Sequence, residues 1–554
     1  FQHPYHHKTS ESGCSEVVNT VVLMGSSVDL LFEKRMDLVS RDIINGLPDP
    51  LISHILSFLP TKEAASSSVL SKRWRFLFAS VTNLDFKSNG DDDVASTSFM
   101  DFVERVLALQ GSAPINRFSL DCSDYPDVDR VTSWILNVLK RGVSDFDLSL
   151  SEYPLPPEIF VSKTLVKLKL GPGNDLTLGE DVEDVFLPKL KTLDIDSVVF
   201  EEEGVGFAKL LSGCPVLGEL ALMNIGWENW KSCSVSVTTL KRLTFSCDDD
   251  DSDFDENPNS VSIDTPNLEY LEYSDTIADK YPKVNFDSLV EAHIGLRMTG
   301  DQIAVADATF SEDGYFSEGD HVEKEMVGNA TDFLMGICNV RILYLSAKAL
   351  EVLAFCCEAT PVFNNLNQLT VESNSETGWD SLPGLLNNCP NLETLIFEGL
   401  VHQCNDRCGN VCCCKRPKHP SCLSSSPVKV LKIVVCENDE ETMELEQVKH
   451  FLKKMPCLEQ LIVYFKTSYD PSVFELSKKL QKIRKMASPK CKIHVISQNL
   501  SLAFTLPSSL TTRWSTAPPE EEYAPPQEEF APSKEEYDPF EDEFYPSEDE
   551  ISWL

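Results

Sequence analysis

The chain has 554 residues, of which 42% are hydrophobic, and its formal net charge at pH 7 is −40. This length is sufficient for one large domain or for two to three ordinary ones. The acidic balance argues against nucleic acid and against a membrane as partners, because phosphate groups and anionic lipids both need basic protein surface.

Residues 1–35 begin with Phe1 and show neither a charged start nor a cleavable signal pattern. We expect Met36 to be the natural start and residues 1–35 to be a disordered or upstream extension. No stretch approaches the run of about 18 apolar residues that a membrane helix needs. The 18 cysteines, many of them inside apolar patterns, predict free thiols in a reducing compartment, the nucleus or the cytoplasm.

Residues 42–86 predict three short helices. Leu47-Pro48-Asp49-Pro50 begins the first helix, because proline suits a first turn. Pro60 ends it, Thr61 is expected to cap the second helix, and residues 71–78 form a third, amphipathic run.

These helices carry more apolar side chains than about 45 residues can bury alone. Burial stabilises each such side chain by about 1.5–3 kcal/mol. We therefore expect several of them to be covered by a partner, with a helical cap on the following domain as the open alternative. The side chains concerned are Leu51, Ile52, Ile55, Leu56, Phe58, Leu59, Val69, Leu70, Trp74 and Phe78.

The same stretch resembles an F-box, the Skp1-binding motif of plant F-box/LRR proteins. It contains the leading Leu-Pro, the ILSFLP core and the V-L-S-K-R-W-R run in the family order. Ser68 stands where many relatives have Thr, and Phe78 where many have Trp. The resemblance implies an F-box at 36–86. Its Skp1-facing or core positions would be Leu47, Pro48, Leu51, Ile52, Ile55, Leu56, Leu59, Pro60, Val69, Leu70, Ser71 and Trp74.

After residue 87, apolar residues recur with others three and five positions later. In a strand the second and third residues share one face, so the first must turn inward from a loop. This is the L-x-x-L-x-L element of leucine-rich repeats. The sets are 115/118/120, 143/146/148, 165/168/170, 190/193/195, 217/220/222, 240/243/245, 268/271/273, 340/343/345, 366/369/371, 392/395/397, 428/431/433 and 458/461/463.

Three segments between these sets repeat as well, at 210–217, 385–392 and 451–458. Each reads as a helix end, a stopping proline and the entry to a strand. Outer helices and inner strands make an α/β solenoid, which is expected over 87–423. The repeats are irregular, as in the resembled family.

Two interruptions are expected inside the solenoid. Residues 248–256 form an acidic loop. Residues 297–332 are expected to be a long loop or a poorly ordered insertion, although 289–294 also fits a degenerate repeat.

A third irregular stretch, 402–422, is rich in cysteine. Cys404, Cys408 and Cys412 could supply three zinc ligands, with His419 or Cys422 as the fourth. The spacing lacks a second tidy cysteine pair, and adjacent Cys412, Cys413 and Cys414 cannot all face one metal. An irregular loop without metal is therefore the prediction, and no cofactor is expected.

Residues 424–496 resemble the FBD region of the same family and are expected to continue the repeats, with a helix at Glu444–Lys454. Residues 497–554 predict a disordered acidic tail. In it EEYAPPQ-like heptads repeat with a proline in each, which excludes a coiled coil. The tail is either a solubilising segment or a docking peptide for a basic surface.

No phosphate-binding loop, dinucleotide fingerprint, zinc-protease motif or nucleophile elbow occurs in the sequence. The family resemblance implies a non-catalytic adaptor of an SCF-type (Skp1–cullin–F-box) ubiquitin ligase. Its partners would be a Skp1-like protein, a cullin complex through Skp1, and a target protein bound by the repeats. The alternatives are a non-ligase leucine-rich-repeat scaffold and, with less support, a zinc hydrolase at 402–422.

Overall fold

The computed structural model describes residues 46–88, 93–122, 127–150, 153–172, 174–175, 185–197, 205–224, 227, 231–247, 257–310, 326–405, 408–413, 422–435, 441–465, 478–480, 482–483, 490–497 and 504–505. The chain divides into two compact units, 1–506 and 507–554. The second unit lies wholly outside the described residues, as do the predicted extension 1–35 and nearly all of the predicted tail. No helix in the described part combines the length and apolar character that a bilayer crossing requires.

Three short helices open the described chain, as the sequence predicted: α2 (Asp49–Leu56), α3 (Thr61–Ser67) and α4 (Lys72–Phe78). Helix α2 begins directly after Pro48 and has Pro50 in its first turn, where a missing N–H costs nothing. Ser71 caps α4 by accepting a 3.3 Å hydrogen bond from the backbone N–H of Trp74.

The predicted capping role of Thr61 is wrong. Thr61 is the first residue of α3, and its hydroxyl accepts a 2.7 Å hydrogen bond from the backbone N–H of Asp85. Asp85 lies on β1 (Asn83–Lys87), the first strand of the large sheet. The hydroxyl thus attaches the helices to the sheet, through a contact between residues far apart in the chain.

A single sheet of sixteen strands runs through the described residues in chain order. Fourteen of its fifteen strand pairs are parallel, and the last pair, β20–β21, is antiparallel. After β1 the strands are β2 (Arg117–Cys122), β3 (Asp145–Leu150), β5 (Lys167–Leu170), β7 (Thr192–Asp196), β8 (Glu219–Met223), β10 (Arg242–Ser246), β12 (Tyr270–Thr276), β14 (Glu291–Arg297), β15 (Ile342–Leu345), β16 (Gln368–Glu372), β17 (Thr394–Glu398), β18 (Val430–Val435), β19 (Gln460–Phe465), β20 (Lys492–Ser497) and β21 (Phe504–Thr505).

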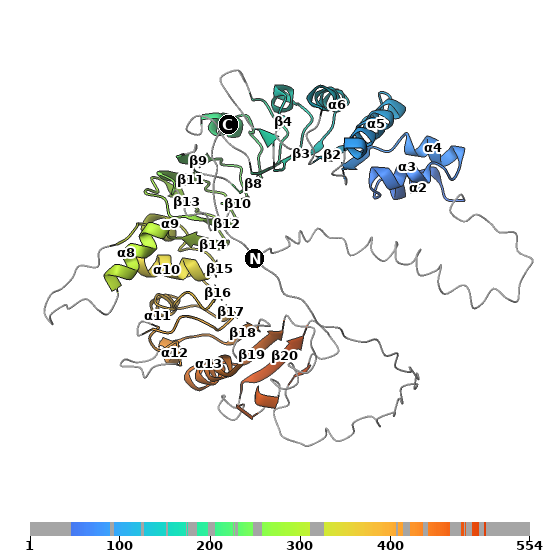
Figure 1. Ribbon diagram of the computed structural model, residues 1–554. Coiled ribbons are helices and arrows are strands. Elements are labelled where there is room, and N and C mark those ends of the chain that lie inside the picture. Colours follow the sequence, from blue (N-terminus) through green and yellow to red (C-terminus); the bar gives the residue numbers. More distant parts are fainter. Residues whose placement is uncertain are drawn as a thin grey trace, which may run out of the picture. The chain divides into compact units, whose positions relative to one another are not determined.

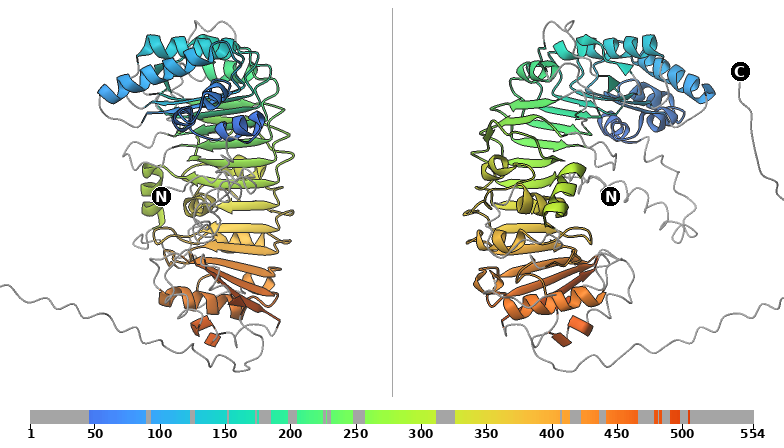
Figure 2. Two further views of the ribbon diagram at one scale, coloured as in Figure 1. Left: turned by 90° about the vertical axis from the view of Figure 1, so that its right-hand side faces the viewer. Right: turned by 60° about the vertical axis from the view of Figure 1, so that its left-hand side comes forward.

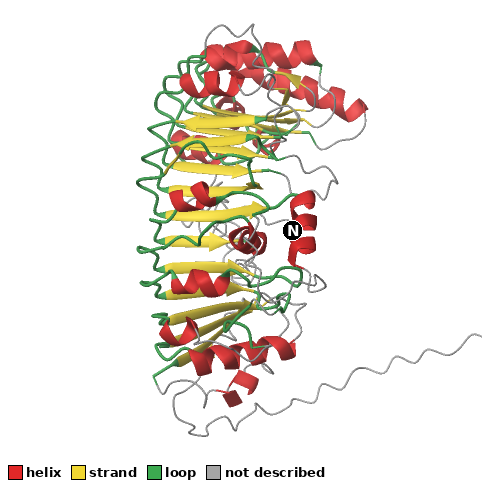
Figure 3. Ribbon diagram, turned by 90° about the vertical axis from the view of Figure 1, so that its left-hand side faces the viewer, coloured by secondary structure: helices red, strands yellow, loops and turns green. Residues whose placement is uncertain are grey.

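The repeat prediction is confirmed residue by residue. In one repeat Leu190 is fully buried in the loop before β7, while Leu193 and Ile195 are buried on that strand. Leu193 pairs with Leu168 on one side and with Leu220 on the other, so equivalent positions stack along the sheet. Figure 3 shows the strands as successive rungs with the loops turning at their ends. The stacked leucine rows form the core.

Most helices lie on the outer side of the bent sheet (Figures 1 and 2). They cover the buried leucines from the outer side of the sheet, as a solenoid requires. They are α5 (Asp93–Gln110), α6 (Val128–Lys140), α7 (Val205–Ser212), α8 (Gly300–Phe310), α9 (Thr331–Gly336), α10 (Ala347–Phe355), α11 (Leu382–Asn387), α12 (Cys422–Ser425) and α13 (Glu441–Lys454), with a 3₁₀ turn, η2 (Pro157–Val161).

The middle repeats use short strands where outer helices were expected. The strands β9 (Ser232–Ser236), β11 (Ser260–Asp264) and β13 (Val284–Asn285) form a second parallel sheet. A smaller pair joins β4 (Tyr153–Pro154) to β6 (Asn174–Asp175). These strands lie between main-sheet strands in the sequence, which is where the solenoid pattern had predicted helices.

The structure changes two of the predicted boundaries. The sheet begins at Asn83 rather than at 87, because Val81, Leu84 and Phe86 repeat the same spacing and are buried in the core. In the predicted insertion 297–332, residues 300–310 form α8 instead of a loop. Thr299 and Gln302 cap this helix reciprocally, the Thr299 N–H donating to the Gln302 side chain at 3.0 Å and the Gln302 N–H to the Thr299 hydroxyl at 3.3 Å.

The degenerate repeat considered at 289–294 is a real strand, β14, paired with β12 and β15. Downstream, β18, β19 and β20 extend the main sheet, and the helix predicted at 444–454 is α13, which begins at Glu441. The acidic loop 248–256 lies outside the described residues.

Candidate functional site

The three N-terminal helices are fixed to the start of the sheet by buried side chains. Ile52 and Leu56 of α2 are fully buried, Trp74 and Phe78 of α4 are nearly so, and all four belong to the same core cluster as Leu84 and Phe86 of β1. The Arg73 guanidinium bonds the Asp49 carboxylate at 2.7 Å and so connects α4 to α2. The three helices are thus held in place on the repeats and are not a loose extension of the chain.

The outer surface of these three helices is strongly apolar. Leu51, Ile55 and Phe58 are 42–59% exposed, and their spacing of four and seven residues places them on one side of α2 and the turn after it. Val69 and Leu70, in the turn before α4, are 82% and 68% exposed, and Phe76 of α4 is 71% exposed. These six side chains are called the apolar platform below.

The structure divides the twelve predicted Skp1-contacting or core residues into three groups. Ile52, Leu56 and Trp74 lie in the chain's own core. Leu47, Leu59 and Ser71 are partly buried. The exposed group comprises Pro48, Leu51, Ile55, Pro60, Val69 and Leu70.

Two exposed residues were missing from the predicted binding set. Phe58 had been counted among the surplus apolar side chains but not among the contact residues. Its spacing of seven residues from Leu51 was an available signal. Phe76 sits between charged Arg75 and buried Leu77, and the sequence contains no signal that singles it out.

A second surface feature crosses the other side of the sheet. Side chains alternate along each strand, so the residues between the buried leucines point away from the helices, to what is called here the open face. The Arg242 guanidinium lies 3.8 Å over the Tyr270 ring, His293 follows at 5.4 Å, and Tyr344 stacks on His293 at 5.4 Å between centroids. These four residues form an aromatic ladder across β10, β12, β14 and β15.

Carboxylates surround this ladder. The Tyr270 hydroxyl donates to Glu272 at 3.1 Å, and the Tyr344 hydroxyl donates to Glu372 at 3.2 Å. Burial raises the pKa of Tyr344, and the nearby charges of Glu372 and Glu398 raise it further. The centre of the open face therefore combines aromatic rings with negative charge.

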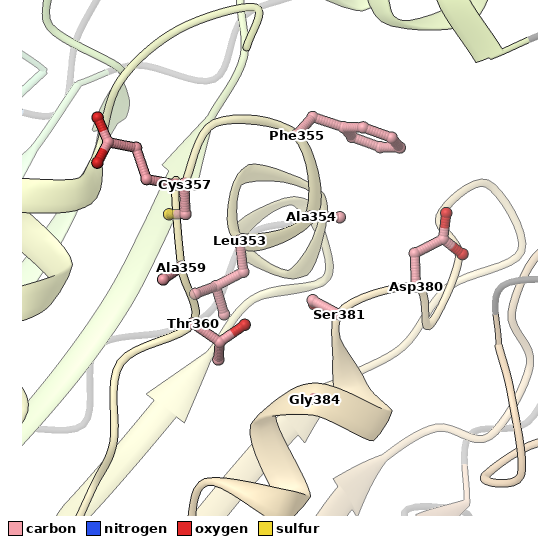
Figure 4. A pocket seen from close by; sticks show the side chains of 10 residues that line it. Leu353, Ala354, Phe355, Cys357, Ala359, Thr360, Asp380, Ser381 and Gly384 are labelled. Atoms are coloured by element: carbon pink, nitrogen blue, oxygen red, sulfur yellow. The ribbon is translucent and has the colours of Figure 1, made fainter. Parts of the chain in front are cut away.

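A pocket of about 410 Å³ opens between the end of α10 and the start of α11 (Figure 4). Its lining consists mostly of small and apolar side chains such as Leu353, Ala354 and Ala359, with the carboxylates of Glu358 and Asp380. The Ser381 hydroxyl at its edge donates to the Leu350 carbonyl at 2.7 Å and so holds the two helices together. This hollow lies between adjacent repeats.

The predicted metal-free loop 402–422 brings several of its sulfur and imidazole groups together. His402, Cys404 and Cys412 place one possible ligand atom each within 4.8 Å of the others. Cys422 begins α12 and is buried, while Cys414 and His419 lie outside the described residues.

Comparison with known proteins agrees with this geometry. A family model for the F-box domain matches residues 44–86. A second model, described as the leucine-rich repeats of the FBD-associated F-box protein At5g56370, matches residues 131–290. The first match covers the apolar platform, and the second runs from within α6 to the residue before β14.

Several curated relatives from Arabidopsis thaliana are similar over nearly their whole length. F-box/LRR-repeat protein At3g59200 is 70% identical over 498 residues, which are 88% of this chain and 94% of the relative. F-box/LRR-repeat protein At3g59210 is 56% identical over 491 residues, 86% of this chain and 99% of the relative. The chain belongs to the plant F-box/LRR-repeat proteins.

Family membership sets the general type of function. F-box domains generally bind Skp1, and F-box/LRR proteins are generally non-catalytic adaptors of SCF ubiquitin ligases. Another relative, putative F-box/FBD/LRR-repeat protein At3g59240, is 48% identical over 485 residues, 84% of this chain and 91% of the relative, and its name includes the FBD region.

Proposed function

We propose that this F-box/LRR-repeat protein is the target-recognition adaptor of an SCF-type ubiquitin ligase, with α2–α4 binding a Skp1-like protein. The observation that carries the proposal is the apolar platform. Leaving such side chains in water forgoes about 1.5–3 kcal/mol each, and exposed apolar clusters of this kind mark interfaces.

The buried and the exposed apolar residues of α2–α4 have different tasks in this proposal. Ile52, Leu56 and Trp74 hold the helices against each other and against the sheet. Leu51, Ile55 and Leu70 would enter the interface with the Skp1-like protein. The cullin complex would be reached through that protein, and the adaptor would act by holding target lysines near a charged ubiquitin-conjugating enzyme.

The experiment is co-purification of the full chain with a plant Skp1-like protein. Leu51→Asp and Leu70→Asp place a charge in the proposed interface and should abolish binding. Val216→Asp is the matched control, because Val216 is also an exposed apolar residue but lies far along the chain, after α7. Equal binding by all four proteins would disprove the proposal.

We propose that target proteins bind the open face at the aromatic ladder. Large rings supply contact area at low entropic cost, and aromatic side chains are frequent in binding hot spots. The surrounding carboxylates favour a segment that carries lysine or arginine, through ion pairs and cation–π contacts.

This second part is tested with immobilised lysine- and arginine-rich peptides and with acidic peptides of equal length. Wild-type protein should prefer the basic set, and Tyr344→Ala with Glu372→Gln should remove the preference while Skp1 binding stays intact. A preference that survives these changes would instead reflect the net charge of −40.

The alternative, a non-ligase scaffold whose helices only cap the first repeat, draws on the burial of Ile52, Leu56 and Phe78 against the chain's own core. It predicts that charges at Leu51 and Leu70 change no interaction of the protein.

The adaptor proposal also places the protein in the nucleus or cytoplasm, where the free cysteines of the described residues would stay reduced. A fluorescent fusion followed by microscopy tests this location.

A further inference from the structure

The loop after β17 assembles nitrogen and sulfur atoms that the adaptor function does not use. The ligand atoms of His402, Cys404 and Cys412 lie within 4.8 Å of one another, and the two sulfurs are 3.5 Å apart. In a tetrahedral zinc site with Zn–S bonds of about 2.3 Å, two sulfurs are about 3.8 Å apart. The observed spacing is therefore close to that of two thiolates on one metal.

His402 is oriented as a metal ligand would be. Its Nδ1 lies 3.0 Å from the carbonyl oxygen of Leu400, which can only accept, so Nδ1 carries the proton. The other nitrogen, Nε2, then has a free lone pair, and it is buried without a hydrogen-bond partner among the described residues. The whole side chain is only 7% exposed, and its ring stacks on Trp379 at 3.7 Å.

This arrangement leaves a buried acceptor in need of a partner. An unpaired buried polar atom costs about 1–3 kcal/mol. Metal-ligating histidines characteristically donate their second ring nitrogen to a carbonyl, as His402 does to Leu400. The cost is removed if Nε2 binds a cation.

Cys408, four residues from both Cys404 and Cys412, is the candidate for a fourth ligand. Its sulfur lies 3.3 Å from the side-chain oxygen of Asn405 and 3.7 Å from the carbonyl oxygen of Gln403. It is buried, with 1% of its surface exposed. One imidazole and two thiols thus meet in this loop, and the buried thiol of Cys408 lies in the same loop outside that group of three.

Neighbouring repeats hold this loop in place. Gln447 of α13 donates to the Val411 carbonyl at 2.6 Å and accepts from the Cys413 N–H at 2.8 Å. His450, one turn further along α13, lies 2.8 Å from the Asn410 carbonyl. On the other side, the Gln403 N–H donates to the Thr377 carbonyl at 2.8 Å. The cluster therefore lies where three consecutive repeats meet.

We propose that His402, Cys404, Cys408 and Cys412 bind one structural Zn²⁺ ion. Three thiolates and one imidazole are a common closed set for structural zinc, and soft sulfur ligands select against magnesium and calcium. Because four protein ligands leave no position for water, the site is structural and not that of a hydrolase. Its role is to pin the cysteine-rich loop between the repeats of β16, β17 and β18.

The zinc content of purified full-length protein tests this proposal. Elemental analysis after metal-free gel filtration in a reducing buffer should find about one zinc per chain. Cobalt substitution should produce the sulfur-to-metal charge-transfer and visible bands of a tetrahedral thiolate site. Chelation of the metal should lower the melting temperature of the wild-type protein.

The variants separate a ligand from a merely structural residue. Cys412→Ser and His402→Ala should lower the zinc content to below about one tenth of the wild-type value, whereas His402→Cys should restore it. Cys457→Ser is the matched control, since Cys457 is an exposed thiol outside the cluster, and its zinc content should be unchanged.

Three results would overturn the proposal: a folded wild-type protein with less than about one tenth of a zinc per chain, a Cys404–Cys412 disulfide in the reducing buffer, or zinc that survives both ligand variants. If His402→Ala does not fold, the wild-type zinc content and the cobalt spectrum still decide. The outcome is independent of the adaptor proposal, because Cys412→Ser should leave binding of the Skp1-like protein unchanged.

Discussion

The leucines of the repeats and those of the N-terminal helices are the same kind of residue with opposite environments. Leu193 on β7 is fully buried between Leu168 and Leu220, whereas Leu51 is half exposed and Leu70 is 68% exposed. Each inner repeat has a neighbour on both sides that covers its apolar row. The three helices stand at the end of the stack, so the sheet can cover only one side of them.

This comparison teaches where function resides in such a chain. Apolar residues of the solenoid interior stabilise the fold and tell nothing about partners. Apolar residues that the end of the stack leaves uncovered are available for another molecule. Substitutions in the two regions should therefore separate stability from binding.

The largest expected effect is on folding. Phe245 is 1% exposed and stacks between Trp227 and Tyr273, with centroids 5.9 and 5.2 Å away. Phe245→Ala should lower the free energy of unfolding by about 3–5 kcal/mol, because it leaves a cavity in the row. Denaturant titration measures the change, and a loss below about 1 kcal/mol would mean that the row relaxes around the gap.

The next effect is on binding alone. The double change Leu51→Asp with Ile55→Asp should weaken the affinity for a Skp1-like protein by about a hundredfold or more, since each charge must be desolvated in the interface. The melting temperature should stay within about 2 °C of wild type, because both side chains already face water. Calorimetry of the pair and a thermal melt give the two values, and a large drop in melting temperature would contradict the assigned exposure.

The junction between the two regions gives a smaller effect. Thr61→Val keeps the shape of the buried side chain but removes the hydroxyl that accepts from the Asp85 N–H. We expect a loss of about 1–3 kcal/mol in the unfolding of α2–α4. Hydrogen exchange should show faster exchange in α3 and β1, with the repeats from β7 onward unchanged. Uniform loss of protection would mean that α2–α4 and the sheet unfold as one unit.

The smallest effect is that of a single cap. Ser71→Ala removes the acceptor for the Trp74 N–H and should cost about 1 kcal/mol. Ser71→Asp should recover most of this stability, because aspartate is an equally good cap. Since Ser71 is partly buried beside Leu70, the aspartate variant also tests whether charge is tolerated there. Equal stability of all three proteins would show that the cap is unimportant in this helix.

Most of the solenoid could be read from the sequence, because its signal is local. The spacing of three and two between apolar residues specifies a loop residue and two strand residues whatever the distant chain does, and every predicted set lies in the expected place. The F-box motif is equally compact, which is why its helices and its family were predicted correctly. The set at Val81, Leu84 and Phe86 was missed because it was assigned to the helices.

Burial, in contrast, depends on neighbours far away in the chain, and only the tertiary structure could decide it. Nothing in residues 42–86 says that Ile52 is buried while Leu51 faces water. The partner of Thr61 is a strand residue 24 positions later, and the ladder joins Arg242 to Tyr344 across four strands. The cysteine spacing likewise predicted a loop without metal, and only the folding of that loop against Trp379 and α13 brings its imidazole and thiols together.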